Sequence, residues 1–318
     1  MITGHDYSAF LEGEYLSTFV AGGGGTVKFA VATDDDHAAP FSAELARHAV
    51  ADGYVVARVD AALTRVHMME QVFFAVAAQI DWDALAKTTV RAAWAAAAHP
   101  VPDGSDDITV GGLAARYGVD AAELSRDVNR YLQQRIYRDY EMVQEFRIAM
   151  LRLCQAHLAT GQVTDAEHGA VLDWLRGDLR QMSLLHSAMI FRRVGRNNAR
   201  QLLFSLAHWL SVNGKPGLLL ELDIRRLGFA RRPRAEERAG LYYTKSALLD
   251  AYELLRQLVD NTDELTHCCV VVITAPEFVT DPNRGVDAYQ ALKLRIFDEV
   301  RDVKRDNPYS SLVRLGAA

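Results

Sequence analysis

Short apolar segments that alternate with helical patterns constrain the fold of this chain more than any other feature. The segments at 27–32 (VKFAVA) and 54–60 (YVVARVD) are rich in β-branched residues and are bounded by glycine or polar residues, as buried strands are. Between them, Phe41, Leu45 and Ala49 recur at the four-residue spacing of one helix face. A strand, a helix and a second strand in this order predict a parallel sheet that is covered by helices.

The same alternation returns in the second half of the chain. Segments 217–223 (GLLLELD) and 270–274 (VVVIT) have strand length, and the periodic apolar residues of 245–261 predict a helix between them. A further helix is predicted at 287–300, and 310–315 is predicted to form a terminal strand or tail. These segments extend the predicted sheet.

Residues 83–200 have a different character, because Ala and Leu at helical spacing dominate there and few strand patterns occur. We therefore predict an α/β core formed by residues 1–82 and 201–318, with a large helical insertion at 83–200. Within the insertion, 109–132 has the pattern of a helix-turn-helix, whose second helix would contact DNA. Two helices packed inside a helical domain explain the same pattern.

Charge and cysteine content exclude some classes of protein. A formal net charge of −6 argues against a surface that is basic throughout, although a local basic patch stays open. Cys154, Cys268 and Cys269 do not make a disulfide framework, so we expect three buried thiols in a reducing cytoplasm. The sequence shows no signal-peptide pattern and no run of about 18 apolar residues, so no membrane helix is expected.

The segment after the first strand bears on nucleotide binding. A P-loop ATPase requires a strand, a GxxxxGK[ST] loop and a helix N-terminus, because the glycines let backbone N–H groups reach the phosphates. The Lys of that loop neutralises the phosphates, and its Ser or Thr holds Mg²⁺. In this chain the corresponding residues are Thr33, Asp34, Asp35, Asp36, His37, Ala38 and Ala39. Ala38 and Ala39 occupy the expected Lys and hydroxyl positions, and the segment contains no glycine.

Three adjacent aspartates act against a phosphate group at this place. A carboxylate about 5 Å from a phosphate raises its energy by about 3 kcal/mol at an effective dielectric constant of about 20. A helix N-terminus contributes only roughly 0.3–1 kcal/mol in the opposite direction. We therefore predict that no triphosphate binds in the usual pose. The aspartates have two interpretations, as ligands of a divalent cation or as an N-terminal cap of the next helix.

Neighbouring glycines do not replace the missing loop. The glycines at 22–25 precede the first strand, and Lys28 lies inside it, so their order is wrong for a phosphate loop. We expect the glycines to turn the chain sharply into the strand.

Two further ATPase elements are expected at strand ends. The strand at 217–223 ends in Asp223, which would order Mg²⁺, but Ile224 follows where a Glu often polarises water. Asp223 is therefore a Walker B-like residue, or it caps the end of the strand. Thr274 ends the next strand as a sensor-like residue, and Arg284 and Arg295 are candidate sensor or finger arginines. The sequence predicts an α/β fold with a P-loop NTPase-like parallel sheet and no catalytic residues.

A family resemblance rests on several short motifs in a fixed order. They are DWLRG at 173–177, NNAR at 197–200, the strand at 217–223, AYE at 251–253, LVDN at 258–261, TAPEF at 274–278, RGV at 284–286, YQAL at 289–292, RI at 295–296 and VRL at 313–315. Together these motifs resemble the ATP-binding proteins of BREX-type bacteriophage-defence systems. The resemblance implies an AAA-like P-loop ATPase with a helical insertion that acts beside other defence proteins on DNA.

The chain departs from the pattern that this resemblance implies at two positions. Such proteins carry an intact GxxGxGK[ST]-like loop after the first strand and usually a Glu after the Asp at position 223. Both are missing here, so we expect a non-catalytic subunit, a pseudo-ATPase that serves as scaffold or regulatory partner. Its expected partner is an intact ATPase paralogue or another component of the system. No cofactor is expected, and ATP with Mg²⁺ would bind only in an atypical way.

Two alternatives remain open at this stage. One is an ATP-binding protein with residual or unusual nucleotide binding. The other is a DNA-contacting module that uses residues 109–132 and an arginine-rich loop. The arginines of that loop are Arg225, Arg226, Arg231, Arg232 and Arg234. The loop is equally well explained as a solvated segment with mixed charges. No metal site is predicted, because the histidines are scattered without HxxxH or similar ligand spacing.

Overall fold

Two compact units make up the chain. The computed structural model describes residues 2–33, 35–103, 105–229, 240–297 and 307–316. Tertiary contacts divide the chain into an α/β unit, Met1–Val76 with Leu210–Ala318, and a helical unit, Ala77–Trp209. Each unit is described by itself.

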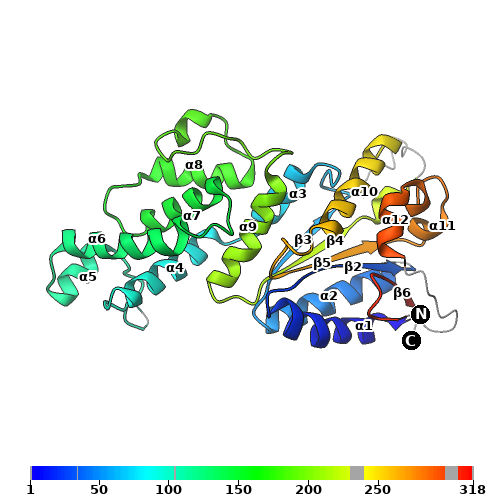
Figure 1. Ribbon diagram of the computed structural model, residues 1–318, viewed down its shortest axis with the longest axis horizontal. Coiled ribbons are helices and arrows are strands. Elements are labelled where there is room, and N and C mark those ends of the chain that lie inside the picture. The colour runs from blue at the N-terminus through cyan, green and yellow to red at the C-terminus, as the bar shows by residue number, and fades with distance from the viewer. Residues whose placement is uncertain (1, 34, 104, 230–239, 298–306, 317–318) are drawn as a thin grey trace. The chain divides into compact units, whose positions relative to one another are not determined.

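A six-stranded, all-parallel sheet forms the centre of the α/β unit (Figure 1). Its strands are β1 (Ile2–Thr3), β2 (Gly25–Ala32), β3 (Val55–Asp60), β4 (Leu218–Asp223), β5 (Cys268–Thr274) and β6 (Leu312–Gly316). They are ordered β1-β6-β2-β5-β4-β3, and every pairing is parallel. The predicted fold class, a P-loop NTPase-like α/β sheet, is confirmed. Strand β1 was not foreseen, because two residues are too short to show a pattern.

Burial on both faces explains why the central strands are so apolar. Every residue of β5 is buried, and so are seven of the eight positions of β2. A parallel sheet with helices on both faces requires such continuous apolar runs. Polar side chains are therefore driven toward the ends of the strands.

Helices lie on both faces of this sheet, α1 and α2 on one and α10 and α12 on the other (Figure 1). The helices of the unit are α1 (Gly4–Phe10), α2 (Asp35–Ala51), α3 (Met69–Ala77), α10 (Lys245–Asp260), α11 (Glu277–Thr280) and α12 (Gln290–Ile296). A π-helix, Leu11–Val20, continues α1, and 3₁₀ turns lie at Arg225–Gly228 and Val286–Ala288. One core cluster joins Tyr7, Phe41 and Leu45 to Val271 and Val313 of the sheet.

Two predicted helices differ from the structure. The helix expected at 287–300 is a 3₁₀ turn followed by the short α12, and residues 298–300 lie outside the described part. The helix expected from the spacing of Phe41, Leu45 and Ala49 begins at Asp35, within the segment compared with the phosphate loop. Among the described residues, no helix combines the length and the apolar character that crossing a membrane requires.

The helical unit is built from short helices with well-formed ends. They are α4 (Trp82–Ala96), α5 (Val110–Tyr117), α6 (Ala121–Leu132), a π-helix (Gln133–Tyr137), α7 (Gln144–Ala156), α8 (Asp165–Arg176), a 3₁₀ turn (Met182–Leu185) and α9 (Ala199–Val212). Asp81, Thr109, Asp120 and Thr164 each accept a backbone N–H bond at a helix start. Such caps contribute about 1 kcal/mol each to stability. Within 77–103 and 105–209 the structure has helices and turns but no strand.

An aromatic cluster holds this unit together. The rings of Trp82, Phe146 and Trp209 lie 6.2 Å apart in each of the three pairs. All three side chains are buried, so they bring the start of α4 together with α7 and α9. Aromatic pairs at this spacing add roughly 0.5–1.5 kcal/mol beyond the apolar area that they bury.

Close backbone approach explains the glycines before β2. A Cβ atom on Gly25 would lie 2.1 Å from the carbonyl oxygen of Leu265 and 2.5 Å from that of Thr262. Gly23 has a positive φ of 103°. The chain therefore turns into the sheet where only glycine fits, as the sequence predicted.

We expect the variant Gly25→Ala to lower the free energy of unfolding by about 1–3 kcal/mol, because the added methyl group displaces the 262–265 backbone. Gly13→Ala is the matched control, since a Cβ there meets nothing within 4 Å. The control is expected to keep or raise stability by about 0.5–1 kcal/mol, because Ala favours a helix. Urea denaturation of both variants measures this. Equal stability of the two would contradict the close approach at Gly25.

Candidate functional site

A pocket of about 570 Å³ opens at the carboxyl edge of the sheet. In open parallel sheets, ligands bind outside the carboxyl ends of the strands. The pocket lies where β2, β3, β4 and β5 end, and its lining is Ala32, Thr33, Asp60, Ala62, Asp223, Arg225, Arg226, Gly228, Phe229, Ala275, Pro276 and Glu277. This volume is in the usual range of small-molecule sites.

The connection between β2 and α2 is shorter than the sequence predicted. Strand β2 ends at Ala32 and α2 begins at Asp35, so two residues separate them. The prediction that residues 33–39 form a loop is therefore wrong for 35–39, which form the first turns of α2. Ala favours a helix, and acidic residues near a helix start are stabilised by the helix dipole. Two connecting residues leave no ring of backbone N–H groups for a triphosphate.

The remaining residues of this segment are placed as follows. Thr33 is exposed and its hydroxyl donates to the Leu315 carbonyl at 3.4 Å. Asp36 is exposed on α2, and His37 is half-buried there. Asp34 lies outside the described residues, as does the side chain of Asp35. The two interpretations of the aspartates stay predictions, although the early start of α2 agrees with a helix cap.

Ala38 and Ala39 have opposite surroundings. Ala38 is 1% exposed and belongs to the core cluster, whereas Ala39 is exposed. A Lys side chain at position 38 would therefore begin inside the core rather than in the pocket. The fold of this segment itself, and not only its residue types, departs from a phosphate loop.

Asp223 is held by an arginine two residues further on. The Arg225 guanidinium donates from Nε to Oδ1 at 3.0 Å and from Nη2 to Oδ2 at 2.6 Å. The Arg225 backbone N–H also donates to Oδ1 at 3.1 Å. Both carboxylate oxygens that could hold Mg²⁺ are thus engaged within the chain. The two side chains are 28% and 25% exposed, so water screens this pair only in part.

A second carboxylate lies beside Asp223. Asp60 ends β3 and is the direct parallel partner of Asp223 in β4. Its Oδ1 accepts a bond from the Ala62 N–H at 2.7 Å. Glu277 adds a third acid to the lining, against Arg225 and Arg226. Asp60 was not among the residues predicted from the sequence, although it shows the same signal as Asp223, an acid that ends an apolar strand.

The two described residues of the arginine patch make contacts inside the chain. Arg226 donates to the Leu241 carbonyl at 2.7 Å, and its guanidinium lies 4.4 Å from the Phe229 ring centre. Arg225 binds Asp223. The predicted patch residues Arg231, Arg232 and Arg234 lie outside the described residues.

Glu221 and Lys28 point elsewhere. Glu221 is 3% exposed, its Oε2 accepts from Ser42 at 2.5 Å, and it lies 2.8 Å from Arg58 Nε. Burial raises the pKa of Glu221, although Ser42 and Arg58 act in the opposite direction. Lys28 Nζ donates to the Tyr15 hydroxyl at 2.6 Å and to the Tyr309 carbonyl at 2.8 Å. Neither residue lines the pocket.

Thr274 and Arg284 do not line the pocket. Thr274 is 1% exposed, and its hydroxyl has no hydrogen-bond partner among the described residues. A space of about 10 Å³ adjoins it, which is room for about one water molecule. Arg284 is buried and donates to the Leu227 carbonyl at 2.9 Å and to the Tyr243 carbonyl at 2.9 Å. The sensor roles of both residues stay predictions.

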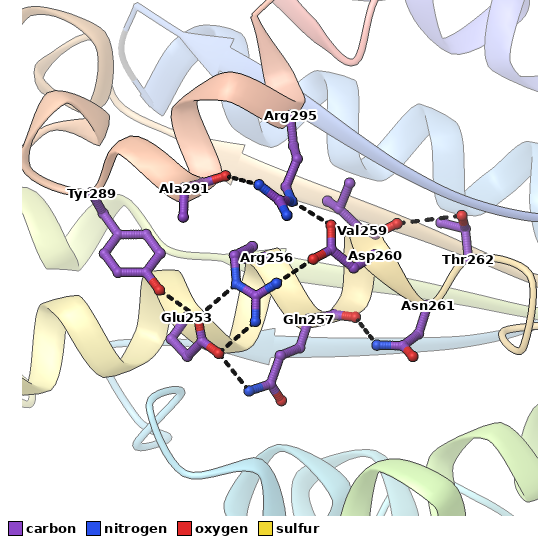
Figure 2. A network of polar contacts seen from close by, with 10 residues as sticks. All are labelled: Glu253, Arg256, Gln257, Val259, Asp260, Asn261, Thr262, Tyr289, Ala291 and Arg295. Carbon is purple, nitrogen blue, oxygen red and sulfur yellow. Dashed lines mark hydrogen bonds and ion pairs between the residues drawn. The ribbon is translucent and has the colours of Figure 1, made fainter.

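Arg295 belongs to a network around α10 (Figure 2). It donates to Asp260, which also accepts from Arg256. Arg256 binds Glu253 through Nε and Nη2, each at 2.7 Å, and Tyr289 donates to the same carboxylate. The network connects α10 to α12, so the contacts shown for Arg295 are structural.

The segment predicted as a helix-turn-helix forms two helices. Helices α5 and α6 are joined by residues 118–120, where Gly118 adopts a left-handed conformation. Arg126 and Arg130 are exposed on α6, but Arg130 pairs with Asp127 and Glu123 lies in the first turn. This mixed charge gives no basic face, and the DNA-contacting role stays a prediction.

We expect Ala38→Lys to lower the free energy of unfolding by about 2 kcal/mol or more, because an ammonium group would be buried without a partner. Ala39→Lys is the matched control and is expected to change stability by about 0.5 kcal/mol at most, since that position is exposed. Chemical denaturation at neutral pH compares the two. If Ala38→Lys were as stable as the control, position 38 would lie in an open loop.

The Glu253 network predicts a pH dependence of stability. The pKa of Glu253 is lowered to about 2, mainly by the hydrogen bond from Arg256. Hydrogen bonds from Tyr289 and Gln257 also lower it, whereas burial acts in the opposite direction. A carboxylate whose pKa is lowered by folding stabilises the protein above its unfolded pKa, and this contribution is lost as pH falls toward the folded value. Glu253→Gln is expected to lower the free energy of unfolding by about 1–3 kcal/mol at pH 7.

The difference in the free energy of unfolding between Glu253→Gln and the native chain should become smaller below about pH 4.5. Denaturation curves between about pH 7 and pH 3 provide the measurement. Glu264→Gln, at an exposed position, is the control and should show neither the loss nor the narrowing. A difference that stays constant with pH would exclude the carboxylate as its source.

Comparison with known proteins gives one family. The family model of the BREX system ATP-binding protein BrxC/D matches residues 108–317, which is more than half of the chain. Searches of curated proteins and of solved structures returned no match. The matched range contains β4, β5, β6 and Asp223 but begins after β2 and the start of α2. The chain therefore belongs to the BrxC/D family of BREX system ATP-binding proteins.

Proposed function

We propose that this chain is a non-catalytic member of its family, a pseudo-ATPase that acts as scaffold or regulatory partner in a BREX-type phage-defence system. The observation that carries the proposal is the Arg225 guanidinium on both oxygens of Asp223. The carboxylate that would order Mg²⁺ is neutralised by the chain itself.

The ion pair is strong enough to compete with a metal. Hydrogen bonds to charged groups contribute about 1.5–3 kcal/mol each, and a two-point contact between Arg and a carboxylate also fixes geometry. Mg²⁺ gives up its water ligands reluctantly and is usually held by one or two carboxylates together with the phosphates. Without a phosphate loop, the metal would have to displace Arg225 without the additional ligands that bound phosphates provide.

Two further features of the described residues support the proposal. Two residues between β2 and α2 leave no backbone cradle for phosphates. Ile224 follows Asp223 and is 3% exposed, so no carboxylate there can polarise water. The short connection concerns phosphate binding, the Arg225–Asp223 pair concerns metal binding, and Ile224 concerns the activation of water. All three support a non-catalytic role.

The pocket at the carboxyl edge of the sheet supports one alternative function. Its volume of about 570 Å³ is large enough for a small ligand that binds without Mg²⁺. Residual or unusual nucleotide binding is therefore the second candidate. In either case we propose that the chain works through a protein partner, such as an intact ATPase of the same system, in the cytoplasm.

Titration calorimetry of the full chain with ATP, with and without Mg²⁺, tests the proposal. We expect no Mg²⁺-dependent binding at ATP concentrations up to about 1 mM, which corresponds to less than about 4 kcal/mol of binding free energy. Micromolar binding with Mg²⁺, together with hydrolysis that Asp223→Ala abolishes, would overturn it. Binding that is independent of Mg²⁺ would favour the second candidate.

The role of Arg225 can be measured directly. Arg225→Ala should release the Asp223 carboxylate beside Asp60 and raise affinity for Mn²⁺ by about tenfold or more, a change of about 1.4 kcal/mol. Arg47→Ala, a surface arginine of α2, is the control and should leave Mn²⁺ affinity unchanged. Electron paramagnetic resonance of free Mn²⁺ gives both values. Equal affinities of the native chain and Arg225→Ala would show that Arg225 does not block the site.

A further inference from the structure

Two histidines and an aspartate converge in the helical unit. Asp83 lies in the first turn of α4, His157 ends α7, and His168 lies in the first half of α8. Asp83 Oδ1 is 3.0 Å from Nε2 of His157 and 2.9 Å from Nε2 of His168. Within the described residues, these three side chains form a group whose possible ligand atoms all lie within 4.8 Å of one another.

We propose that Asp83, His157 and His168 bind a divalent transition-metal ion, with zinc as the best fit. Two imidazole nitrogens and one carboxylate oxygen are a ligand set that zinc uses, with a fourth position left for water or another ligand. Mg²⁺ and Ca²⁺ prefer oxygen ligands alone, so this set selects against them. The site lies in the helical unit and does not depend on the function proposed for the sheet pocket.

The geometry requires little rearrangement. A tetrahedral zinc ion with bonds of about 2.0–2.1 Å separates its ligand atoms by about 3.4 Å. Each nitrogen is therefore within about 0.5 Å of the required spacing from the Asp83 oxygen, and the ligand atoms of the two histidines lie within 4.8 Å of each other. Binding would replace two N–H···O contacts by metal bonds, and each neutral imidazole would carry its proton on Nδ1 instead of Nε2.

Exposure and neighbouring charges define how the site would work. The side chains of His157 and His168 are 18% and 23% exposed, and that of Asp83 is 40% exposed, so an ion can enter. Lys87, one turn further along α4, acts on His157 with its positive charge and opposes a cation. Glu167 is not an additional ligand, because it faces Arg152 at 3.4 Å.

The three ligands come from separate helices. An ion there would connect the start of α4 to the end of α7 and the start of α8, which lie much later in the sequence. Metal binding that requires the folded arrangement adds its binding free energy to stability. The site would therefore act as a structural clip within the helical unit, with one coordination position open.

Another contact of the same kind provides a matched control. His208 Nε2 lies 2.8 Å from Asp139 Oδ2 in the same unit, with similar exposure. Among the described residues, this pair does not belong to a group of three possible metal ligands. His208→Gln removes a His–Asp contact but should not affect metal binding.

The test uses the untagged full chain after removal of metals by a chelator. Zinc affinity is measured by competition with a chromophoric chelator, and Co²⁺ is added as a spectroscopic probe. We expect one Zn²⁺ per chain with a dissociation constant of about 10 μM or lower, a higher Tm with zinc, and the intense visible absorption of four-coordinate Co²⁺. His157→Gln, His168→Gln and Asp83→Asn should each weaken binding by about tenfold or more, whereas His208→Gln should not.

Some outcomes would overturn the proposal. They are zinc binding weaker than about 100 μM, a stoichiometry that the three variants do not change, or an equal loss in His208→Gln. Circular dichroism shows whether each variant is folded. If a histidine variant does not fold, Asp83→Asn decides the question, because Asn preserves the shape of Asp and removes its charge.

Discussion

Burial of the central strands on both faces is the constraint on which the α/β unit depends. Strands β2, β4 and β5 are almost completely covered, and a parallel sheet is stable only under such cover. Polar side chains can then reach water mainly where strands end. Asp60 and Asp223 therefore lie side by side at the carboxyl edge of the sheet, next to the segment after Thr274. The pocket follows from the sheet, whatever chemistry occupies it.

Contacts within the chain engage the charged side chains of this pocket. Arg225 occupies the Asp223 carboxylate, Arg226 binds the 240–241 backbone, and the early start of α2 removes the loop that would bind phosphates. Each contact is local and ordinary. Together they are the contacts on which the proposal of a non-catalytic BrxC/D family member rests.

The helical unit depends on different forces. Aromatic packing around Trp82 and side-chain caps at four helix starts hold its short helices, and these are apolar and local interactions. Against this background, the group formed by Asp83, His157 and His168 is unusual, because three titratable side chains from separate helices meet with their ligand atoms close together. A bound metal ion would explain why two histidines contact the same carboxylate oxygen.

Local patterns determined much of this protein from the sequence alone. The four apolar segments predicted the central strands and their parallel pairing, because a strand buried on both faces must be apolar along its length. Asp223 at the end of its strand, the missing glycines and Lys after β2, and the family resemblance were also predicted, since each is a property of adjacent residues. The two helices within 109–132 were predicted from their pattern as well.

Only the tertiary structure decided how distant side chains meet. The sequence gives no reason for Asp60 to lie beside Asp223, because strand register is set by packing across the sheet. It placed Ala38 in a loop, whereas packing against the core cluster makes it part of α2. The histidines are scattered along the sequence, but the packing of α4, α7 and α8 brings His157 and His168 into contact with Asp83. Spacing along the chain reports local geometry, and contacts between separate elements depend on how the whole core packs.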